Sequence, residues 1–501
     1  MFDYLAIGLT NVLTFTNLTA IIVGTALGLF VGAMPGLSAT MAIAILLPLT
    51  FNMPPATGLS MLASLYMGAM YGGSIAAILI NTPGTPAAAA TVLDGYPMAQ
   101  QGRAGKALGI SLFASLVGGL LSSIALLTIA PILGGVALQF GPVELFAVAV
   151  LGITIIGSLS QGSAIKGLLS GVVGLLLAMI GMDPITGSAR FTFGILNLYS
   201  GVSFTVALIG LFSIPQAIRL IEKDEKAKAV INSFKDKMLP TLAEIKQIGV
   251  TVIRSSFIGI FTGIIPGTGG DTACWFGYNE AKRFSKNRDN FGKGDIEGVA
   301  ASEAANNAVV GGALIPTLTL GIPGSSATAI IMGALMVHGI MPGPTLMTEY
   351  ADVTYTLIWA LLISNFAMFL EGLLFTKAAI HVTRVPNKVL APIIIILCVI
   401  GAFAINNSFF DVYMMLIFGL LGYFMDKIGM PTAPMVVGLI LGQMLNVSLH
   451  QSLMISGGSW LIFFSNPIST VLLIIAAISV FQATPFSARL VKSVKAALSK
   501  S

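Results

Sequence analysis

Pro-Gly dipeptides interrupt four apolar stretches of this sequence, at Pro35, Pro83, Pro266 and Pro323. Proline ends one helix and suits the first turn of the next, and glycine lets the backbone approach a ligand closely. A helix that begins again inside an apolar region offers free N–H groups and a positive dipole end, which suit a carboxylate or a phosphate. A helix that stops there offers carbonyl oxygens, which suit Na⁺. The pattern predicts a binding site for an anion, a cation or both.

The residues around the four dipeptides are the candidate substrate ligands, because their small hydroxyl side chains add neutral donors and acceptors to the backbone groups. They are Pro35, Gly36, Leu37, Ser38, Asn81, Thr82, Pro83, Gly84, Thr85, Pro266, Gly267, Thr268, Gly269, Gly270, Pro323, Gly324, Ser325 and Ser326. The alternative is that Pro-Gly merely kinks a helix or forms an ordinary loop, and for a single dipeptide that alternative is preferable. Four dipeptides in two matched pairs favour the functional interpretation.

A second unusual stretch, EGVAASEAANNAVVGG (residues 297–312), carries a carboxylate and two carboxamides. Glu303, Asn306 and Asn307 share one helical face by their spacing, so they are candidate ion ligands. Such groups are costly in hydrocarbon and should face a cavity or a protein partner. Ion coordination and hydrogen bonding between helices are equally supported. Asp271 follows the third dipeptide and is a further candidate ion ligand, although a first-turn acid needs no such role and the structural interpretation is slightly preferred.

The elements that must position these residues are membrane helices. Of the 501 residues, 56% are hydrophobic and only 9% are charged, against about 25% charged in a soluble domain. Apolar runs of spanning length recur, which predicts an all-α polytopic membrane protein without a separate soluble domain. Cys274, Cys398 and three scattered histidines show no ligand spacing, so neither a transition-metal site nor an organic cofactor is expected. The net charge of +5 comes from loops and gives no indication of nucleic-acid binding.

Lysine and arginine are unevenly distributed along the chain. None precedes Arg103, and a second gap runs from residue 294 to residue 376. Cytoplasmic loops carry the excess of basic residues. The distribution therefore predicts a multi-pass topology with the N-terminus outside, the C-terminus inside and Arg190 as one basic residue outside.

Two parts of the chain repeat the same punctuation. VGAMPGLSAT (31–40) parallels TGIIPGTGGD (262–271), and YGGSIAAILINTPGTPAAAA (71–90) parallels VGGALIPTLTLGIPGSSATA (310–329) with one residue of slip. The third dipeptide has basic loops on both sides and too short an apolar run after it to cross, which predicts a re-entrant hairpin. Its counterpart enters from the uncharged side, so the halves are predicted to be inverted repeats, as in secondary transporters.

The predicted organisation has four parts. The first repeat covers 1–220, with a hairpin at about 18–51 and a broken helix at about 57–100, and a cytoplasmic linker covers 221–246. The second repeat covers 247–482, with a hairpin at about 247–281 and a broken helix at about 297–340, and a cytoplasmic tail covers 483–501. Further spans complete each repeat.

Four blocks carry a family resemblance, namely residues 32–51, 66–108, 263–273 and 297–344. They resemble TctA, the large membrane subunit of the tripartite tricarboxylate transporters, and the resemblance covers essentially the whole chain. It implies a permease of the bacterial inner membrane that works with a small four-helix membrane subunit (TctB-like) and a periplasmic solute-binding protein (TctC-like). It also implies carboxylate uptake driven by a Na⁺ or H⁺ gradient, and an elevator-like movement of the hairpin-containing core against a scaffold.

The predicted function is therefore the large permease subunit of a binding-protein-dependent secondary transporter for tricarboxylates or similar organic carboxylates. Na⁺ is slightly favoured over H⁺ because no isolated proton relay is evident. A channel is the alternative, since paired hairpins also build selectivity filters. An enzyme is disfavoured because the sequence has no His-Glu-x-x-His and no Ser, His and Asp set, and direct ATP drive is disfavoured because it has no Walker A sequence. Neither the carboxylate nor the species bound at each tip follows from the sequence.

Overall fold

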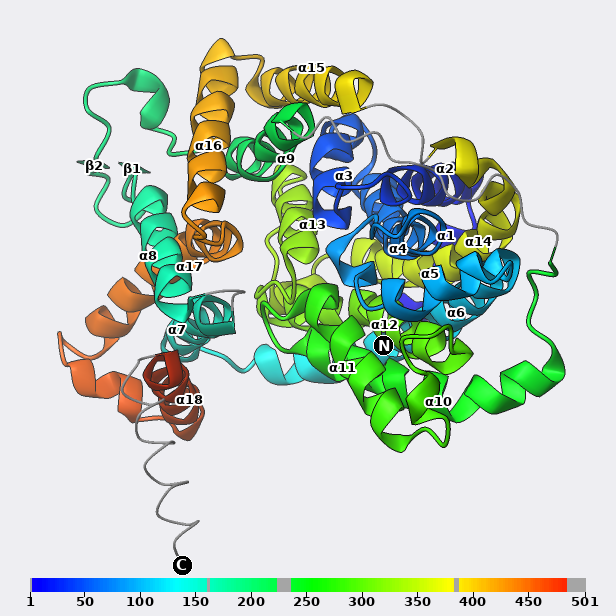
Figure 1. Ribbon diagram of the computed structural model, residues 1–501. Coiled ribbons are helices and arrows are strands. Elements are labelled where there is room, and N and C mark those ends of the chain that lie inside the picture. The colour runs from blue at the N-terminus through cyan, green and yellow to red at the C-terminus, as the bar shows by residue number, and fades with distance from the viewer. Residues whose placement is uncertain (1, 160–162, 223–235, 383–386, 484–501) are drawn as a thin grey trace, which may run out of the picture.

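The computed structural model describes residues 2–159, 163–222, 236–382 and 387–483, and nearly all of this chain is helical (Figure 1). Nine of the described helices are long and apolar enough to cross a membrane. The structure therefore confirms the predicted polytopic helical membrane protein. The middle of the predicted linker (223–235) and all but the first residue of the predicted tail (483–501) lie outside the described residues.

The described helices follow one another along the chain with mostly short connections. They are α1 (Phe2–Val12), α2 (Phe15–Gly32), α3 (Ala39–Leu46), α4 (Pro55–Ile80), α5 (Val92–Gln100), α6 (Ala104–Ala137), α7 (Pro142–Leu159), α8 (Ala164–Ala178), α9 (Phe204–Glu222), α10 (Leu242–Ile264), α11 (Gly269–Phe284), α12 (Ile296–Leu320), α13 (Ser326–Val337), α14 (Ala351–Val382), α15 (Asn387–Asn406), α16 (Phe409–Lys427), α17 (Ala433–Ile455) and α18 (Pro467–Ala483). Short 3₁₀ segments occur between some of them, including η2 (Pro86–Ala88) after α4 and η4 (Arg288–Asn290) after α11.

The prediction of an all-α chain was wrong at one place. Strands β1 (Gly181–Met182) and β2 (Ala189–Arg190) form a short antiparallel ladder between α8 and α9. Asp183 accepts hydrogen bonds from the Ile185 and Thr186 amides and so shapes the turn that joins the strands. Strands of two residues leave no alternating pattern in a sequence, which is why this pair was not predicted.

Helical structure is interrupted near each of the four Pro-Gly dipeptides. Residues 33–38 separate α2 from α3, and 265–268 separate α10 from α11. The break after α4 begins at Asn81, and the break between α12 and α13 covers 321–325. Each break leaves backbone groups at the helix ends without partners within their own helix.

Left-handed residues fix the direction of the chain at these interruptions. Gly36 and Gly267 have φ angles of 84° and 83°, a conformation that glycine adopts without strain. Asn81 ends α4 with a φ of 58°, and Gly321 ends α12 with a φ of 68°. The two hairpin tips therefore share one backbone turn, and the two broken helices share one type of C-terminal cap.

Glycines let the hairpin helices lie directly on the broken helices. Gly24, Gly28 and Gly32 of α2 abut the backbone of α4, and Gly259 and Gly263 of α10 abut the backbone of α12. A Cβ on any of them would overlap main-chain atoms of the neighbouring helix. Small residues at fourfold spacing are the usual basis of close helix packing in membranes, where dispersion contacts replace the hydrophobic effect.

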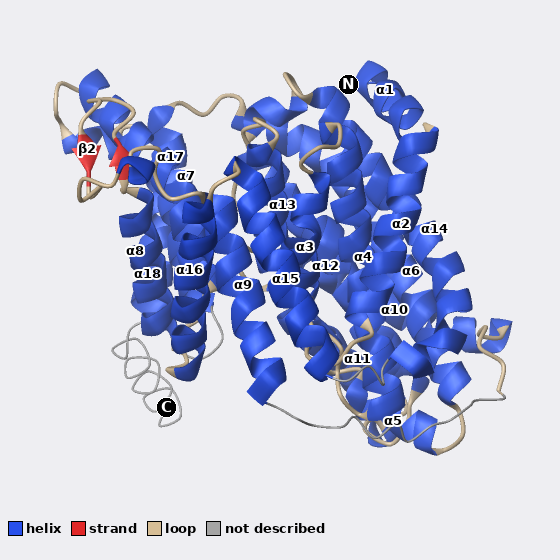
Figure 2. Cartoon of the chain, turned by 90° about the horizontal axis from the view of Figure 1, so that it is seen from above, coloured by secondary structure: helices blue, strands red, loops and turns tan. Residues whose placement is uncertain are grey.

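The helices form two groups (Figures 1 and 2). The core group, α1–α6 and α10–α14, contains all four interruptions, and the outer group consists of α7–α9 and α15–α18. In Figure 1 the core helices lie together on the right and α7, α8, α17 and α18 on the left. Contacts between the groups are made mainly by α3, against α9 and α15, and by α13, against α9 and α17. Helix α3, which follows the first hairpin tip, and helix α13, which follows the second break, thus form the seam between the groups.

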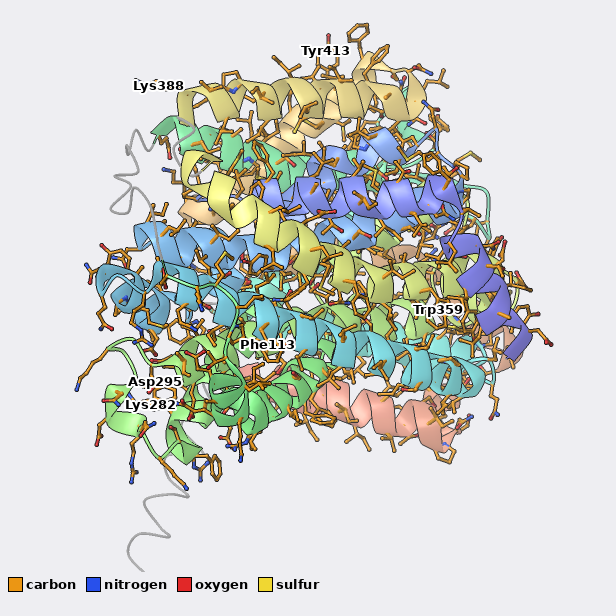
Figure 3. All side chains as sticks on the ribbon, turned by 90° about the vertical axis from the view of Figure 1, so that its right-hand side faces the viewer. Phe113, Lys282, Asp295, Trp359, Lys388 and Tyr413 are labelled. Carbon is orange, nitrogen blue, oxygen red and sulfur yellow. The ribbon has the colours of Figure 1, made fainter. Side chains whose placement is uncertain are left out.

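The helices end at two opposite faces, as Figure 2 shows. The first, the β face, carries β1, β2 and one end of α1, and the second, the α5 face, carries α5. Lys106 pairs with Glu244 at 2.8 Å and joins the start of α6, the helix that follows α5, to the start of α10. Figure 3 shows Lys282 toward one end of the helices and Trp359, which donates to the carbonyl of Leu5 in α1, toward the other.

Candidate functional site

The tip of the second hairpin lies directly against the break between α12 and α13. The Gly267 amide donates to the Gly324 carbonyl at 3.0 Å. A Cβ built on Gly269 would lie 3.8 Å from the Cβ of Ser325. Because Gly269 opens α11 and Ser325 caps α13, the N-termini of two helices converge here. Two positive dipole ends with free N–H groups are the kind of arrangement that suits an anion.

A capping box fixes the start of α13. The Thr328 amide donates to Ser325 Oγ at 3.2 Å, and the Ser325 amide donates to Thr328 Oγ1 at 3.0 Å. The Gly324 amide is held by Thr317 Oγ1 at 3.2 Å. Ser326 is the first residue of the helix. The loop is therefore held by its own side chains, and its geometry does not depend on a ligand.

Tyr66 is the residue at this site that the sequence analysis missed. It lies in α4, is only 2% exposed, and its hydroxyl is 3.2 Å from Ser325 Oγ. Asp271 lies in the first turn of α11, two residues after Gly269. The position of Tyr66 in the sequence could have identified it. Tyr66 precedes Gly72 by six residues, as Asn306 precedes Gly312 by six in the other predicted repeat. The second tip thus brings together a phenol, a serine and two helix starts.

The polar residues of α12 are fully buried in the core group. The Glu303 carboxylate accepts hydrogen bonds from Thr91 and, at 3.3 Å, from Ser115 of α6. Thr91 is also bonded to Ser302 at 2.8 Å. Among the described residues Glu303 has no ion pair, so its carboxylate lies among hydroxyl groups without a neighbouring Lys or Arg. A buried carboxylate in this setting requires either a proton or a bound cation.

Asn306 and Asn307 each use only part of their hydrogen-bonding capacity. Asn306 Nδ2 donates to the Met70 carbonyl of α4 at 3.3 Å, and Asn307 Nδ2 donates to Ser115 Oγ at 2.7 Å. The Oδ1 atoms of both are buried and have no hydrogen-bond partner. The structure shows hydrogen bonding between helices, and ion coordination stays a prediction. The amide nitrogens bond helix to helix, while the amide oxygens remain available.

The first break holds its candidate residues in several different environments. The Gly84 amide donates to the Gly73 carbonyl at 3.0 Å, and Thr82 Oγ1 reaches the Ile80 carbonyl at 3.4 Å. Thr85 is 1% exposed, and its Oγ1 has no hydrogen-bond partner. Asn81 is exposed and Pro83 partly buried. Thr85 is thus the one side chain of this break with a buried, available oxygen among the described atoms.

The first hairpin tip faces the outer group. The Gly36 carbonyl accepts a hydrogen bond from Gln216 of α9. Leu37 is 3% exposed and packs in an apolar cluster with α9, α15 and α16. Ser38 Oγ caps α3 by accepting from the Met41 amide at 3.1 Å, and Pro35 is partly buried. Leu37 therefore serves packing and Ser38 serves capping in this arrangement.

The remaining candidates of the second tip also have different roles: some stabilise the loop, and one borders the polar face of α12. Thr268 Oγ1 donates to the carbonyls of Thr262 and Ile265 and so satisfies the end of α10, while Pro266 is partly buried. A Cβ on Gly270 would meet Asn306 Oδ1 at 3.1 Å and the Ala87 Cβ at 3.0 Å. Gly270 thus lies between the polar face of α12 and η2.

Two glycines of the breaks serve close packing. A Cβ on Gly324 would meet the Gly263 carbonyl oxygen and the Ala313 Cα, each at 2.6 Å. A Cβ on Gly84 would overlap the Gly32 carbonyl oxygen. Larger residues at either position would push the break away from its hairpin helix, whether or not a ligand is bound.

Asp94 of α5 is a further buried carboxylate that the sequence analysis did not single out. Its Oδ1 accepts from the amides of Gly292, Gly294 and Asp295 at 2.8–2.9 Å, and its Oδ2 accepts from the Tyr278 hydroxyl at 2.8 Å. It therefore joins α5, the part of the first broken helix after the break, to the loop that leads into α12. Its four bonds make it a positioning residue.

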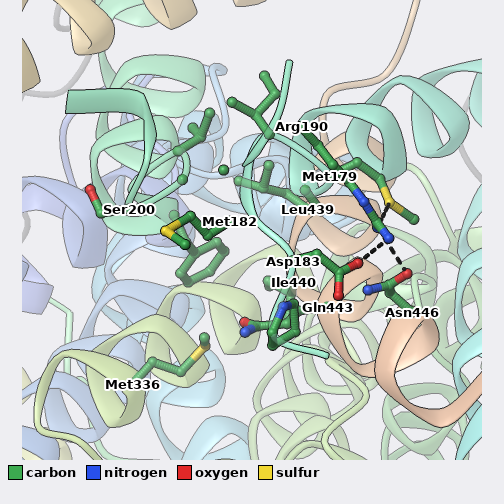
Figure 4. Close-up of a pocket in the computed structure, with 17 residues that line it drawn as sticks. Met179, Met182, Asp183, Arg190, Ser200, Met336, Leu439, Ile440, Gln443 and Asn446 are labelled. Atoms are coloured by element: carbon green, nitrogen blue, oxygen red, sulfur yellow. Dashed lines mark hydrogen bonds and ion pairs between the residues drawn. The ribbon is translucent and has the colours of Figure 1, made fainter. Parts of the chain in front are cut away.

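A cavity of about 270 Å³ lies apart from the breaks, between α8, β1, α13 and α17 (Figure 4). Arg190 pairs there with Asp183 and donates to Asn446 Oδ1 at 3.3 Å. The amide hydrogen bond from Thr186, then that from Ile185 and the charge of Arg190, hold the pKa of Asp183 at about 2. This cavity includes none of the predicted ligands.

The fold and the site define a polytopic helical membrane protein whose interrupted helices meet in a polar, buried interior. No group of three His, Cys, Asp or Glu side chains that could hold a metal ion is found in the part of the chain that the structure describes. The chain belongs to the tripartite tricarboxylate transporter TctA family, whose family model matches residues 18–437. This confirms the family that the four sequence blocks predicted. It makes the protein a component of a transporter rather than a member of an enzyme family.

Two relatives from Agrobacterium vitis are similar over most of their own length. An uncharacterized 52.8 kDa protein in the TAR-I ttuC′ 3′ region is 38% identical over 473 residues, which cover 94% of this chain and 93% of that protein. An uncharacterized protein in the TAR-II ttuC′ 3′ region is 37% identical over 225 residues, which cover 45% of this chain and 93% of that protein.

Proposed function

We propose that this protein is the large permease subunit of a binding-protein-dependent secondary transporter that imports organic carboxylates, coupled to a cation gradient, with Na⁺ as the ion. The observation that carries the proposal is the convergence of the α11 and α13 N-termini beside Ser325 and Tyr66. This arrangement offers backbone N–H groups and two hydroxyls to a carboxylate without a fixed Lys or Arg. A site built on dipoles holds an anion while letting it leave again.

The packing of the helices supports the proposal of two inverted repeats. Matched contacts join the hairpin helices to the broken helices: Gly28 with Leu65, Gly32 with Ala69, Gly259 with Ala305, and Gly263 with Val309. Gly72 meets Leu29 as Gly312 meets Ile260, so the two segments correspond without the one-residue slip of the sequence comparison. In the outer group α8 contacts α17 as α16 contacts α9.

The division into two helix groups supports an elevator-like mechanism. All four interruptions belong to the core group, and the outer group meets it mainly at α3 and α13. A core that carries the bound carboxylate past α9, α15 and α17 would expose the same site at each face in turn. Lys282 lies at the opposite end from Trp359, and the positive-inside rule therefore makes the α5 face cytoplasmic and the β face periplasmic in a bacterial inner membrane.

Uptake by reconstituted protein tests the proposal. The protein is placed in liposomes with its small membrane subunit, the solute-binding protein is added outside, and a panel of labelled carboxylates is offered with inward Na⁺ or with choline at fixed pH. We expect uptake that requires both the binding protein and the Na⁺ gradient. Equal uptake without any gradient would refute secondary transport. Single-channel conductance under the same conditions would instead support the alternative of a channel.

A further inference from the structure

Each of the two broken helices, α4 and α12, carries one polar side chain that is matched with a residue in the break of the other helix. Tyr66 of α4 precedes Gly72 by six residues, and Asn306 of α12 precedes Gly312 by six. Ser325 follows Gly324 in the second break, and Thr85 follows Gly84 in the first. Tyr66 is bonded to Ser325. The corresponding pair in the other half is Asn306 and Thr85.

The second pair differs from the first because its oxygens are unused. Asn306 Oδ1 and Thr85 Oγ1 are both buried and both lack a hydrogen-bond partner, and their residues are 0% and 1% exposed. A buried polar oxygen without a partner is costly in free energy. Two such oxygens, in the pair that corresponds to Tyr66 and Ser325, indicate a bound species that is coordinated by oxygen atoms.

Both side chains lie against the same part of α4. Asn306 Nδ2 donates to the Met70 carbonyl, and a Cβ on Gly73, one turn further along α4, would overlap Thr85 Oγ1. Gly270 marks the same place, because its Cβ would meet Asn306 Oδ1 and the Ala87 Cβ in η2, two residues after Thr85. The space is therefore shared by α4, α12, the first break and the start of α11.

The electrostatics of the two breaks differ. Glu303 lies one turn before Asn306 on α12, is completely buried, and has no ion pair among the described residues. Helix α4 ends at Ile80, shortly before Thr85, so its negative dipole end lies in this break. Helix α12 ends in the same way at Leu320, so the second break also has a negative dipole end, and Asp271 lies in the first turn of α11; the starts of α11 and α13 add two positive helix ends there. The buried Glu303 carboxylate therefore favours a cation near the first break, and the two helix starts favour an anion at the second.

We propose that Thr85 Oγ1 and Asn306 Oδ1 are ligands of the coupling cation, Na⁺, and that the carboxylate is bound separately at the second break by Ser325, Tyr66 and the starts of α11 and α13. A hydroxyl and a carboxamide oxygen beside a carboxylate match the hard oxygen ligands that Na⁺ requires, as unwound helix segments supply them in other transporters. This assignment rests on the proposed function and specifies which break binds which species.

Na⁺ binding by the purified protein, measured without transport, tests the assignment. The melting temperature in detergent is followed as NaCl replaces choline chloride at constant ionic strength. Wild-type protein should be stabilised by Na⁺, since a ligand that binds only the folded state raises its stability. Thr85→Val keeps the shape but loses the oxygen, and should raise the half-saturating Na⁺ concentration by about tenfold, or about 1.4 kcal/mol. Thr85→Ser keeps the oxygen and should behave like the wild type.

Two further variants keep the test decisive. Asn306→Ala should weaken the response to Na⁺ as Thr85→Val does, and Ser325→Ala should leave it unchanged while raising the carboxylate KM in the uptake assay. A wild-type Na⁺ response in both Thr85→Val and Asn306→Ala would overturn the assignment, as would a wild-type protein that choline and Na⁺ stabilise equally. Failure of the transport proposal is a separate result, because gradient-independent uptake would leave a Thr85-dependent response to Na⁺ intact.

Discussion

At the scale of single residues, the interior of this protein uses oxygen and nitrogen atoms in place of fixed positive charges. Tyr66 and Ser325 supply hydroxyls, and Glu303 is surrounded by Thr91 and Ser115. Placing Lys or Arg at this depth would cost several kcal/mol and would hold an anion too firmly. Neutral donors and helix ends are compatible with binding and release in each cycle.

Tyr66→Phe should raise the carboxylate KM by up to about tenfold while leaving the melting temperature nearly unchanged. The ring is kept, so packing survives, and one neutral hydrogen bond is worth about 0.5–1.5 kcal/mol. Uptake kinetics at saturating Na⁺ measure the effect. Tyr413→Phe, at an exposed position on α16, is the matched control. A wild-type KM for Tyr66→Phe would mean that the hydroxyl acts only on Ser325.

Asp183→Asn should destabilise the protein in a pH-dependent way. Because the folded pKa of Asp183 is lowered to about 2, its stabilising effect is complete above the unfolded pKa of about 3.9 and is lost as pH falls through the folded value. The difference in melting temperature between Asp183→Asn and the wild type should therefore be constant from about pH 8 to about pH 5 and shrink below about pH 4. Asp289→Asn, at an exposed acid, serves as the control.

At the scale of elements, the hairpins depend on glycine contacts with the broken helices. Gly259 and Gly263 allow α10 to lie on the backbone of α12, and the tip of this hairpin is bonded to the break by Gly267. The position of the converging helix starts thus depends on how closely α10 approaches α12. A shift of α10 would displace the proposed anion site without altering any of its side chains.

Gly259→Ala should lower stability by about 1–3 kcal/mol and reduce uptake, because its Cβ would overlap the Ala305 carbonyl oxygen. Gly249→Ala lies in the same helix with no neighbouring atom within 4 Å, and should be neutral or slightly stabilising. Melting temperature and uptake are measured for both. Equal effects of the two substitutions would show that contact with α12 is not what requires glycine at position 259.

At the scale of the whole molecule, the seam between the core and outer groups determines what can move. Ile322 in the second break lies against Gly152 of α7, where a Cβ would be 3.1 Å from Ile322 Cγ2. Within the outer group, a Cβ on Gly171 of α8 would lie 3.2 Å from Ile153 Cγ2 of α7. Gly152 of α7 thus lies between Ile322 of the core group and Leu441 of α17 in the outer group, whereas the adjacent Ile153 contacts α8.

A disulfide across the seam should stop transport if the core moves. Gly152→Cys with Ile322→Cys, in a chain whose buried free cysteines Cys274 and Cys398 are replaced by alanine, puts a cysteine on each side of the seam, where a Cβ at position 152 would contact the Ile322 side chain. Uptake should fall to background on oxidation and return on reduction, while Na⁺ still stabilises the protein. Gly171→Cys with Ile153→Cys should transport in both states. Full uptake by the oxidised seam variant would contradict the elevator mechanism.

The sequence by itself determined the class of protein, its family and the location of its interruptions. Spanning helices are readable because burial in lipid requires apolar runs of fixed length, and breaks are readable because proline and glycine act on the backbone locally. The buried residues 303, 306 and 307 were readable because polar groups are rare at such positions. Each of these signals lies within a short stretch of sequence, between about one helical turn and one helix in length.

The tertiary structure decided which of these residues act together. Tyr66 meets Ser325, and Asp94 meets the loop before α12, across some 200 residues or more of sequence. The sequence around a tyrosine in an apolar helix, or around an acid in a short helix, does not indicate which distant residue it will contact. Whether Leu37 faces a ligand or α9, and whether Thr85 keeps a free oxygen, depends on how separate helices pack, because a buried polar atom is defined by its neighbours in space.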